Sequence, residues 1–201
     1  YTEEIKRLGV FLCINGTGIL NRWVKKITGN NYSYAQINEA ASVVTPGSEG
    51  LTVLPFGNGA ERILNNKNIG AQISGIDLNK HTEAHIFRAV QEGIAFAFRY
   101  GLDIMKENGM HPQVIRAGKA NMFLSNVFAS CFVNTLGIPV ELYNCDGSVG
   151  AAMGAGIGSG EFSSAKEAFK NFTPLELIEP GKVNYEEHYQ NWLQHLNKVL
   201  N

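Results

Sequence analysis

Three kinds of feature are scarce in this 201-residue chain, and each scarcity excludes a class of protein. There are only three cysteines and no CxxC pair, which excludes zinc ribbons and thioredoxin-type redox sites. Neither sign of charge is in excess, because 17 basic residues stand against 18 acidic ones. The chain therefore has no basic field that would attract nucleic acid or anionic lipid. No apolar run approaches the roughly 18 residues that a membrane span needs.

The residues that are present describe a globular chain. Hydrophobic residues make up 44 % and charged residues 17 %, which excludes disorder because disordered chains are rich in charge and poor in apolar residues. A chain of this length buries roughly 70 % of the surface that its unfolded form exposes. We therefore expect residues 1–201 to form a single domain that needs no structural metal, with a small molecule or a protein as its partner.

The cysteines indicate the cellular compartment, and the first residue bears on whether the chain is part of a longer protein. Cys13, Cys131 and Cys145 lie among apolar or small neighbours, which is typical of buried thiols in a reducing compartment, so we expect the protein in the cytoplasm. The chain begins at Tyr1, without an initiator methionine or a signal peptide. We expect it to be part of a longer protein.

Hydrophobic periodicity predicts alternating helices and strands. Ser33, with Gln36 three residues later, forms the capping box that marks a helix start. A largely parallel sheet is expected, because strands alternate with helices along the second half of the chain. The fold class is therefore α/β, a sheet flanked by helices. The expected helices are 19–27, 33–41, 82–108, 121–137, 147–160 and 184–200, and the expected strands are 51–56, 71–76, 113–118 and 139–143.

Three short motifs resemble known sites without meeting their requirements. His81 and His85 stand four apart, but a zinc helix of the HExxH type needs the glutamate directly after the first histidine, so we interpret them as a solvated helix start. Gly118-Lys119 lacks the P-loop's earlier glycine and its following hydroxyl residue. Ser159 lies in GSGEF, which is not the GxSxG of a nucleophile elbow.

The segment RAGKAN, residues 116–121, is more informative. A predicted strand ends here, the chain turns at Gly118, and a helix is expected to start near Asn121. Ligands of open α/β sheets lie outside the carboxyl ends of strands, where helix N-termini offer free N–H groups. Gly118 would let a flat base or ribose approach, and Asn121 could cap the helix and bind a purine edge. An ordinary strand, turn and capped helix explain the segment equally well.

The helix expected at 147–160 has a face of small residues, Gly150, Ala151, Gly154 and Ala155. Such a face allows another backbone to approach closely. We expect this helix to pack against the sheet. The functional alternative is that it lies beneath a nucleotide cleft and shapes it without touching the ligand.

The order of several segments resembles the C-terminal half of carbohydrate kinases of the FGGY family, with xylulose kinases most similar. The resemblance runs from about Val10 to Phe162, and ILNRWVKKITG is similar to the family helix with a central Trp that opens this domain. The other segments that carry it are LPFGNGAER, GAQISGI, HTEAHIFRAVQEGIAFAFRYGLDIM and QVIRAGKANMFLSNVFASCFVNTLGIPVELYNCDGSVGAAMGAGIGSGEF.

The resemblance implies the second actin-like ATPase domain, of ribonuclease-H type, with a mixed sheet flanked by helices. It also implies phosphoryl transfer from MgATP to a sugar hydroxyl, with D-xylulose as the expected sugar. RAGKAN matches the adenosine motif, so Gly118 would lie against the nucleotide beside Ala117, and Asn121 would contact adenine. Gly18 and Arg22 match positions on the other side of the base.

The resemblance also leaves alternatives open. The family's catalytic aspartate and sugar contacts belong to an N-terminal domain outside this chain, so no catalytic residue is expected here, and a homodimer of the full protein stays open. The usual glycine pair is Ala117-Gly118, followed by Lys119, and the alanine methyl narrows the approach to ribose or phosphate. A kinase-derived domain with a decayed nucleotide site is therefore one alternative. An actin-fold ATPase or sensor domain without a sugar substrate is the other.

Overall fold

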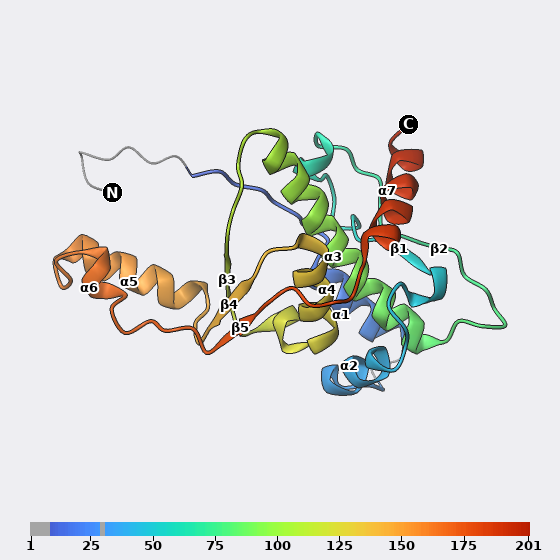
Figure 1. Ribbon diagram of the computed structural model, residues 1–201, viewed down its shortest axis with the longest axis horizontal. Coiled ribbons are helices and arrows are strands. Elements are labelled where there is room, and N and C mark those ends of the chain that lie inside the picture. The colour runs from blue at the N-terminus through green and yellow to red at the C-terminus, as the bar shows by residue number, and fades with distance from the viewer. Residues whose placement is uncertain (1–8, 29–30) are drawn as a thin grey trace.

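The computed structural model describes residues 9–28 and 31–201, so the expected beginning at Tyr1 lies outside the described residues (Figure 1). Helices and strands alternate along most of the chain. Three single turns of 3-10 helix, η1 Ser48–Gly50, η2 Arg62–Leu64 and η3 Asn121–Leu124, connect them. The helices are α1 Gly18–Ile27, α2 Tyr34–Ser42, α3 Glu83–Glu107, α4 Asn126–Leu136, α5 Gly147–Ser159, α6 Ala165–Ala168 and α7 Glu186–Leu200; the strands are β1 Thr52–Leu54, β2 Gln72–Ser74, β3 Ile115–Gly118, β4 Val140–Tyr143 and β5 Glu176–Ile178.

The strands confirm an α/β fold with a mixed sheet, but the expectation of a largely parallel sheet is wrong. β1 and β2 form an antiparallel pair, and in the three-stranded sheet β4 lies between β3, which is parallel to it, and β5, which is antiparallel. β5 was not expected from the sequence. It has three residues between Pro174 and Pro180, and its pairing with β4, not its own pattern, makes it a strand.

Local signals in the sequence set several helix ends correctly. The Ser33 hydroxyl accepts from the Gln36 amide and the Gln36 side chain accepts from the Ser33 amide, which confirms the capping box. Gly109 and Gly137 follow α3 and α4 with φ of 78° and 67°, a left-handed conformation that glycine adopts without strain.

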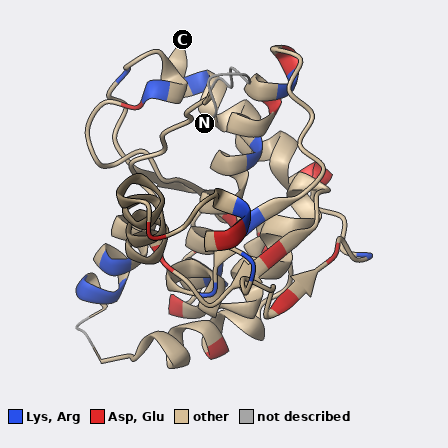
Figure 2. Ribbon diagram, turned by 90° about the vertical axis from the view of Figure 1, so that its left-hand side faces the viewer, with Lys and Arg blue, Asp and Glu red and all other residues tan. Residues whose placement is uncertain are grey.

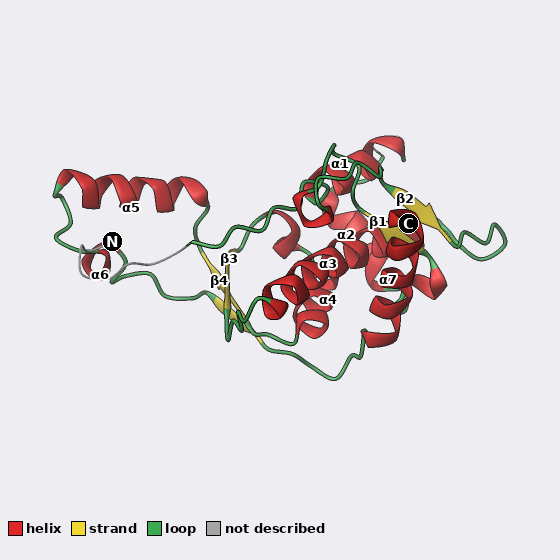
Figure 3. Ribbon diagram, turned by 90° about the horizontal axis from the view of Figure 1, so that it is seen from above, coloured by secondary structure: helices red, strands yellow, loops and turns green. Residues whose placement is uncertain are grey.

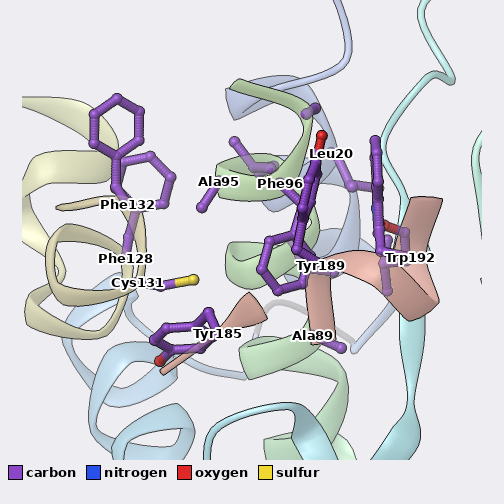
Figure 4. Packing of buried hydrophobic residues seen from close by; sticks show 14 of the residues in the cluster. Leu20, Ala89, Ala95, Phe96, Phe128, Cys131, Phe132, Tyr185, Tyr189 and Trp192 are labelled. Carbon is purple, nitrogen blue, oxygen red and sulfur yellow. The ribbon is translucent and has the colours of Figure 1, made fainter. Parts of the chain in front are cut away.

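The long helix α3 lies at the centre of the core. Its Phe96 faces Tyr189 and Trp192 of α7 (Figure 4). The Trp192 indole N–H donates to the carbonyl of Val53 at 2.8 Å, which ties α7 to β1. The aromatic contacts and this hydrogen bond thus hold together elements that are far apart in the sequence.

One turn of α3 carries a buried ion pair. Arg88 and Glu92 join through Nε and Oε1 at 2.7 Å, with 7 % and 3 % of their side chains exposed. Glu92 also accepts from the Gly47 amide at 3.0 Å and the Ser48 hydroxyl at 2.8 Å, while Arg88 donates to the Val44 carbonyl at 2.7 Å. These bonds fix the loop after α2 onto α3 and leave neither charge uncompensated.

The expectation that the small-residue helix packs against the sheet is wrong. α5 has no buried residue, and Figures 1 and 3 show α5 and α6 projecting to one side of the remaining helices. The physical reason lies in the sheet. On one face of the sheet, the Glu141 carboxylate accepts hydrogen bonds from the Arg116 guanidinium and the Tyr143 hydroxyl. This face therefore offers little apolar surface to a helix.

The cysteines differ from expectation in their exposure. Only Cys131 is buried, in α4, and burial raises the pKa of its thiol. Cys13 is exposed in the loop before α1, and Cys145 is half-buried in the loop after β4. Their apolar or small sequence neighbours did not reveal that both positions lie on loops.

Charged residues of both signs are interspersed over the described chain (Figure 2). No helix among residues 9–28 and 31–201 is both long enough and apolar enough to cross a membrane.

The buried ion pair gives a stability prediction. Glu92→Ala should lower the free energy of unfolding by about 3–5 kcal/mol, because it leaves the Arg88 charge buried without its partner. Glu141→Ala, which breaks the solvent-facing pair with Arg116, should cost far less. Urea unfolding of the two variants beside the unaltered chain measures both. Equal losses would show that the Arg88–Glu92 pair is not structurally important.

Candidate functional site

A cavity of about 900 Å³ lies where α1, α2 and the turn after β3 meet. All five residues expected at a site, Gly18, Arg22, Ala117, Gly118 and Asn121, line it. The first two and the last three are about a hundred positions apart in the sequence, so the fold alone brings them together. The other lining residues are Thr17, Ile19, Asn21, Tyr34, Asn38, Phe98, Ala120, Met122, Phe123, Leu124, Ser125, Phe128, Cys145, Asp146 and Gly147.

One wall is the first turn of α1. Gly18 is its first residue, and a Cβ added there would meet no atom within 4 Å, so this position opens into free space. Arg22 follows one turn later with an exposed side chain. Within residues 9–28 and 31–201 no carboxylate pairs with Arg22, which leaves its guanidinium available at the cavity wall.

A buried carboxylate fixes the loop that leads into α1. Glu61 is 0 % exposed, and its Oε2 accepts from the Asn15 amide at 2.9 Å. The Asn15 side chain donates to the Ala60 carbonyl, also at 2.9 Å. Gly16 lies so close to the Pro55 carbonyl that a Cβ would overlap it. The position of Gly18 is therefore set by the segment 55–61.

The opposite wall is the end of β3. Gly118 lines the cavity, but the space that its Cβ would take is occupied by the Cys145 carbonyl oxygen. The structure thus gives a different reason for this glycine from the one expected: it lets two chain segments meet. Lys119 is not among the lining residues, because its ammonium pairs with Glu176 at 2.8 Å.

Asn121 does not cap the helix after β3, so this expectation is wrong. η3 separates β3 from α4, and the Ser125 hydroxyl caps α4 by accepting from the Phe128 amide at 3.3 Å. Asn121 has a φ of 52°, a left-handed conformation that asparagine tolerates better than most residues. Its side chain is exposed at the cavity.

Sequence reasoning missed several lining residues. Tyr34 and Asn38 stand four apart on α2, so they share one face, while Ile37 and Ala41 are buried in the core. From the sequence this polar face is indistinguishable from a solvated one. Only the positions of α1 and η3 turn it into a cavity wall.

Asp146, just before the helix expected at 147–160, was not expected at a site, but it also lines the cavity. Its carboxylate caps α5 by accepting from the amides of Ser148 and Val149 at 2.9 and 3.3 Å. The Ser148 hydroxyl, and then these amides, hold the pKa of Asp146 below its ordinary value. It is therefore a carboxylate near neutral pH.

The cavity lining combines aromatic rings with polar side chains. Phe98, Phe123 and Phe128 bring three aromatic rings to the cavity, and Arg22 and Asn121 bring polar groups. Binding sites for organic ligands are typically about 300–1,000 Å³, mostly apolar, with a few placed polar groups. The arrangement suits a ligand with a flat heteroaromatic ring and a charged chain.

The two histidines at the start of α3 serve local structure. His81 Nδ1 accepts from the Asp77 amide at 3.0 Å, and His85 Nδ1 accepts from the Thr82 amide at 3.1 Å. The described part of the chain holds no group of three or more His, Cys, Asp or Glu side chains that could bind a metal ion.

Comparison with known proteins identifies relatives of this chain. The C-terminal domain of the FGGY family of carbohydrate kinases matches residues 3–159. A xylulose kinase of Lactococcus lactis is 31 % identical over 86 % of this chain and 36 % of its own length, and one of Haemophilus influenzae is 28 % identical over 84 % and 35 %. The chain thus spans about a third of the length of these relatives.

A solved structure shows the same fold. The xylulose kinase of Rhodospirillum rubrum superposes with a TM-score of 0.75 at 25 % identity, over 91 % of this chain and 38 % of that one. The fold is the actin-like ATPase fold, as the sequence led us to expect.

Gly18 and Gly118, two of the glycines that line the cavity, predict opposite responses to an added methyl group. Gly118→Ala should lower the free energy of unfolding by about 1–3 kcal/mol, because the new Cβ meets the Cys145 carbonyl. Gly18→Ala should cost nothing, or stabilise α1 by up to about 1 kcal/mol, because its Cβ meets open space. Thermal and urea unfolding measure both. A Gly118→Ala variant as stable as the unaltered chain would refute the close contact.

Proposed function

Since the chain belongs to the FGGY family of carbohydrate kinases, whose C-terminal domain it matches, we propose that its cavity binds the nucleotide of an ATP-dependent sugar kinase. The observation that carries the proposal is the single cavity lined by both predicted segments, Gly18 with Arg22 and residues 117–121. The reaction is phosphoryl transfer from MgATP to a sugar hydroxyl.

The cavity residues suit the demands of this reaction. In phosphoryl transfer the protein mainly positions the reactants and stabilises charge. The aromatic rings offer a surface for the base, and Arg22 can stack on it or pair with a phosphate. Magnesium is carried on the ATP phosphates, where it retains several waters, so this chain need not supply a full ligand set.

The acceptor side of the reaction belongs to residues outside this chain. We propose D-xylulose as the sugar, because xylulose kinases recur among the relatives. The catalytic base and the sugar contacts lie in the N-terminal domain of the full protein. This chain contributes the nucleotide half of the cleft and by itself transfers no phosphoryl group to sugar.

One observation bears on the alternative of a decayed nucleotide site. Lys119, which departs from the family pattern, pairs with Glu176 and leaves the cavity free. On that wall, the Ala117 methyl is then the only group added relative to the usual glycine pair of the family. This favours a site that still binds nucleotide, and an actin-fold sensor without a sugar substrate would share this property.

Binding to the isolated chain tests the nucleotide site. ATP should shift the amide NMR signals of residues 16–23 and 117–122 together, with a millimolar Kd worth ~4 kcal/mol, because half of the contacts are absent. Gly18→Leu should weaken binding by about tenfold or more, corresponding to at least ~1.4 kcal/mol, because its side chain enters the cavity. The fold should be unaffected.

Gly158→Leu is the matched control. Gly158 also lies on a helix where an added Cβ meets no atom within 4 Å, but it does not line the cavity. This variant should bind ATP like the unaltered chain. Shifts confined to residues 77–85 or to α7, or equal ATP affinity of the two leucine variants, would refute the site.

A further inference from the structure

Gln91 is a polar residue in an unusual place. It lies in the middle of α3 and is 0 % exposed, although an amide buried without hydrogen bonds is costly. Its Oε1 accepts from the Ser125 hydroxyl at 2.6 Å, and its Nε2 donates to Asn38 Oδ1 at 3.2 Å. Ser125 and Asn38 both line the cavity, on η3–α4 and on α2. Gln91 therefore links two walls of the cavity from behind.

These hydrogen bonds run in one direction from Ser125 through Gln91 to Asn38. The Ser125 oxygen accepts from the Phe128 amide, and its hydroxyl donates to Gln91. The Gln91 oxygen is thereby taken, and its NH₂ faces Asn38. As a result the Asn38 oxygen is directed to Gln91, and the part of the side chain left for the cavity is the Nδ2 N–H donor.

The surroundings of Asn38 suit one part of a nucleotide. Phe98 and Phe128 line the same cavity, and Phe128 is 1 % exposed, so this part of the lining is apolar. The base is the flat, least hydrated part of ATP, and its ring nitrogens accept hydrogen bonds. The Asn38 amide N–H, in a cavity that these aromatic rings also line, therefore matches a ring nitrogen of a purine.

We propose that Gln91 is a positioning residue for base recognition: it holds Asn38 so that the Asn38 amide donates to a ring nitrogen of the purine. Gln91 does not touch the nucleotide. The inference rests on the proposed function, because it names how the same cavity recognises its ligand. It adds two residues, Asn38 as a base contact and Gln91 as its support.

A double-mutant cycle tests the proposal on the 201-residue chain. Gln91→Met keeps the side-chain length without its polar groups, and Asn38→Ala removes the proposed donor. Each should raise the Kd for ATP by about 2- to 10-fold, the range expected for one hydrogen bond. The double variant should bind like Asn38→Ala alone, because Gln91 then has nothing left to position.

Thr135→Val is the matched structural control. Thr135 is also buried, at 3 % exposure, and lies near the far end of α4, outside the cavity lining. Like Gln91→Met, this variant should have a lower free energy of unfolding than the unaltered chain. Its ATP affinity, however, should be unchanged. Equal affinity of Gln91→Met and the unaltered chain, or losses that multiply in the double variant, would overturn the positioning role.

Two further measurements keep the proposal testable if Gln91→Met does not fold. Asn38→Asp keeps an oxygen toward Gln91 but replaces the donor with an acceptor, so it should bind ATP no better than Asn38→Ala. Of 1-deaza-, 3-deaza- and 7-deaza-ATP, one should bind the unaltered chain as weakly as ATP binds the Asn38→Ala variant. The Asn38→Ala substitution should not raise the Kd for that analogue any further. Unaltered affinity of Asn38→Asp, or three analogues that all bind like ATP, would overturn the contact.

The outcomes separate this inference from the proposed function. If ATP shifts no signals at residues 16–23 and 117–122 of the unaltered chain, the nucleotide site itself is refuted and the inference falls with it. If ATP shifts them but the cycle is additive, the nucleotide site stands and only the role of Gln91 is refuted.

Discussion

Three polar side chains on adjacent turns of α3 must find hydrogen-bond partners inside the protein, and their partners determine where the surrounding elements lie. Arg88 and Glu92 bind each other and the loop after α2, while Gln91 binds α2 and the N-cap of α4. Leaving any of these groups unpaired would cost more than its hydrogen bonds contribute. The hydrogen bonds that hold these walls of the cavity therefore lie in the protein interior, behind the walls.

The remaining wall depends on the same principle. The loop before α1 is held by the buried carboxylate of Glu61, and α1 itself packs on the core through Leu20 and Val24. The face of α1 that carries Gly18 and Arg22 is left for the cavity. A ligand site between elements that are each anchored separately is organised before the ligand arrives, which lowers the cost of binding.

The sequence predicted what local chemistry determines. The capping box at Ser33 and the ends of α2, α3 and α4 depend on neighbouring residues, and the expected helices 33–41, 82–108 and 121–137 ended within one residue of the observed ends. β5, the exposed position of α5 and the displacement of the helix cap from Asn121 to Ser125 depend on partners distant in sequence, and they were not predicted. For the site, spacing alone left RAGKAN ambiguous. Its pairing with Gly18 and Arg22 came from the family resemblance, whereas Tyr34 and Asn38 had no signal that separates them from a solvated helix face.

If this one cavity receives the nucleotide, photoaffinity labelling should mark the residues that line it. The chain would be irradiated with 8-azido-ATP, digested, and its labelled peptides identified by mass spectrometry. Label is expected on peptides that contain residues 17–22, 34–38 or 117–128, and it should be lost when excess ATP competes. Label only on peptides from α5, α6 or α7, or label that excess ATP does not reduce, would contradict nucleotide binding in this cavity.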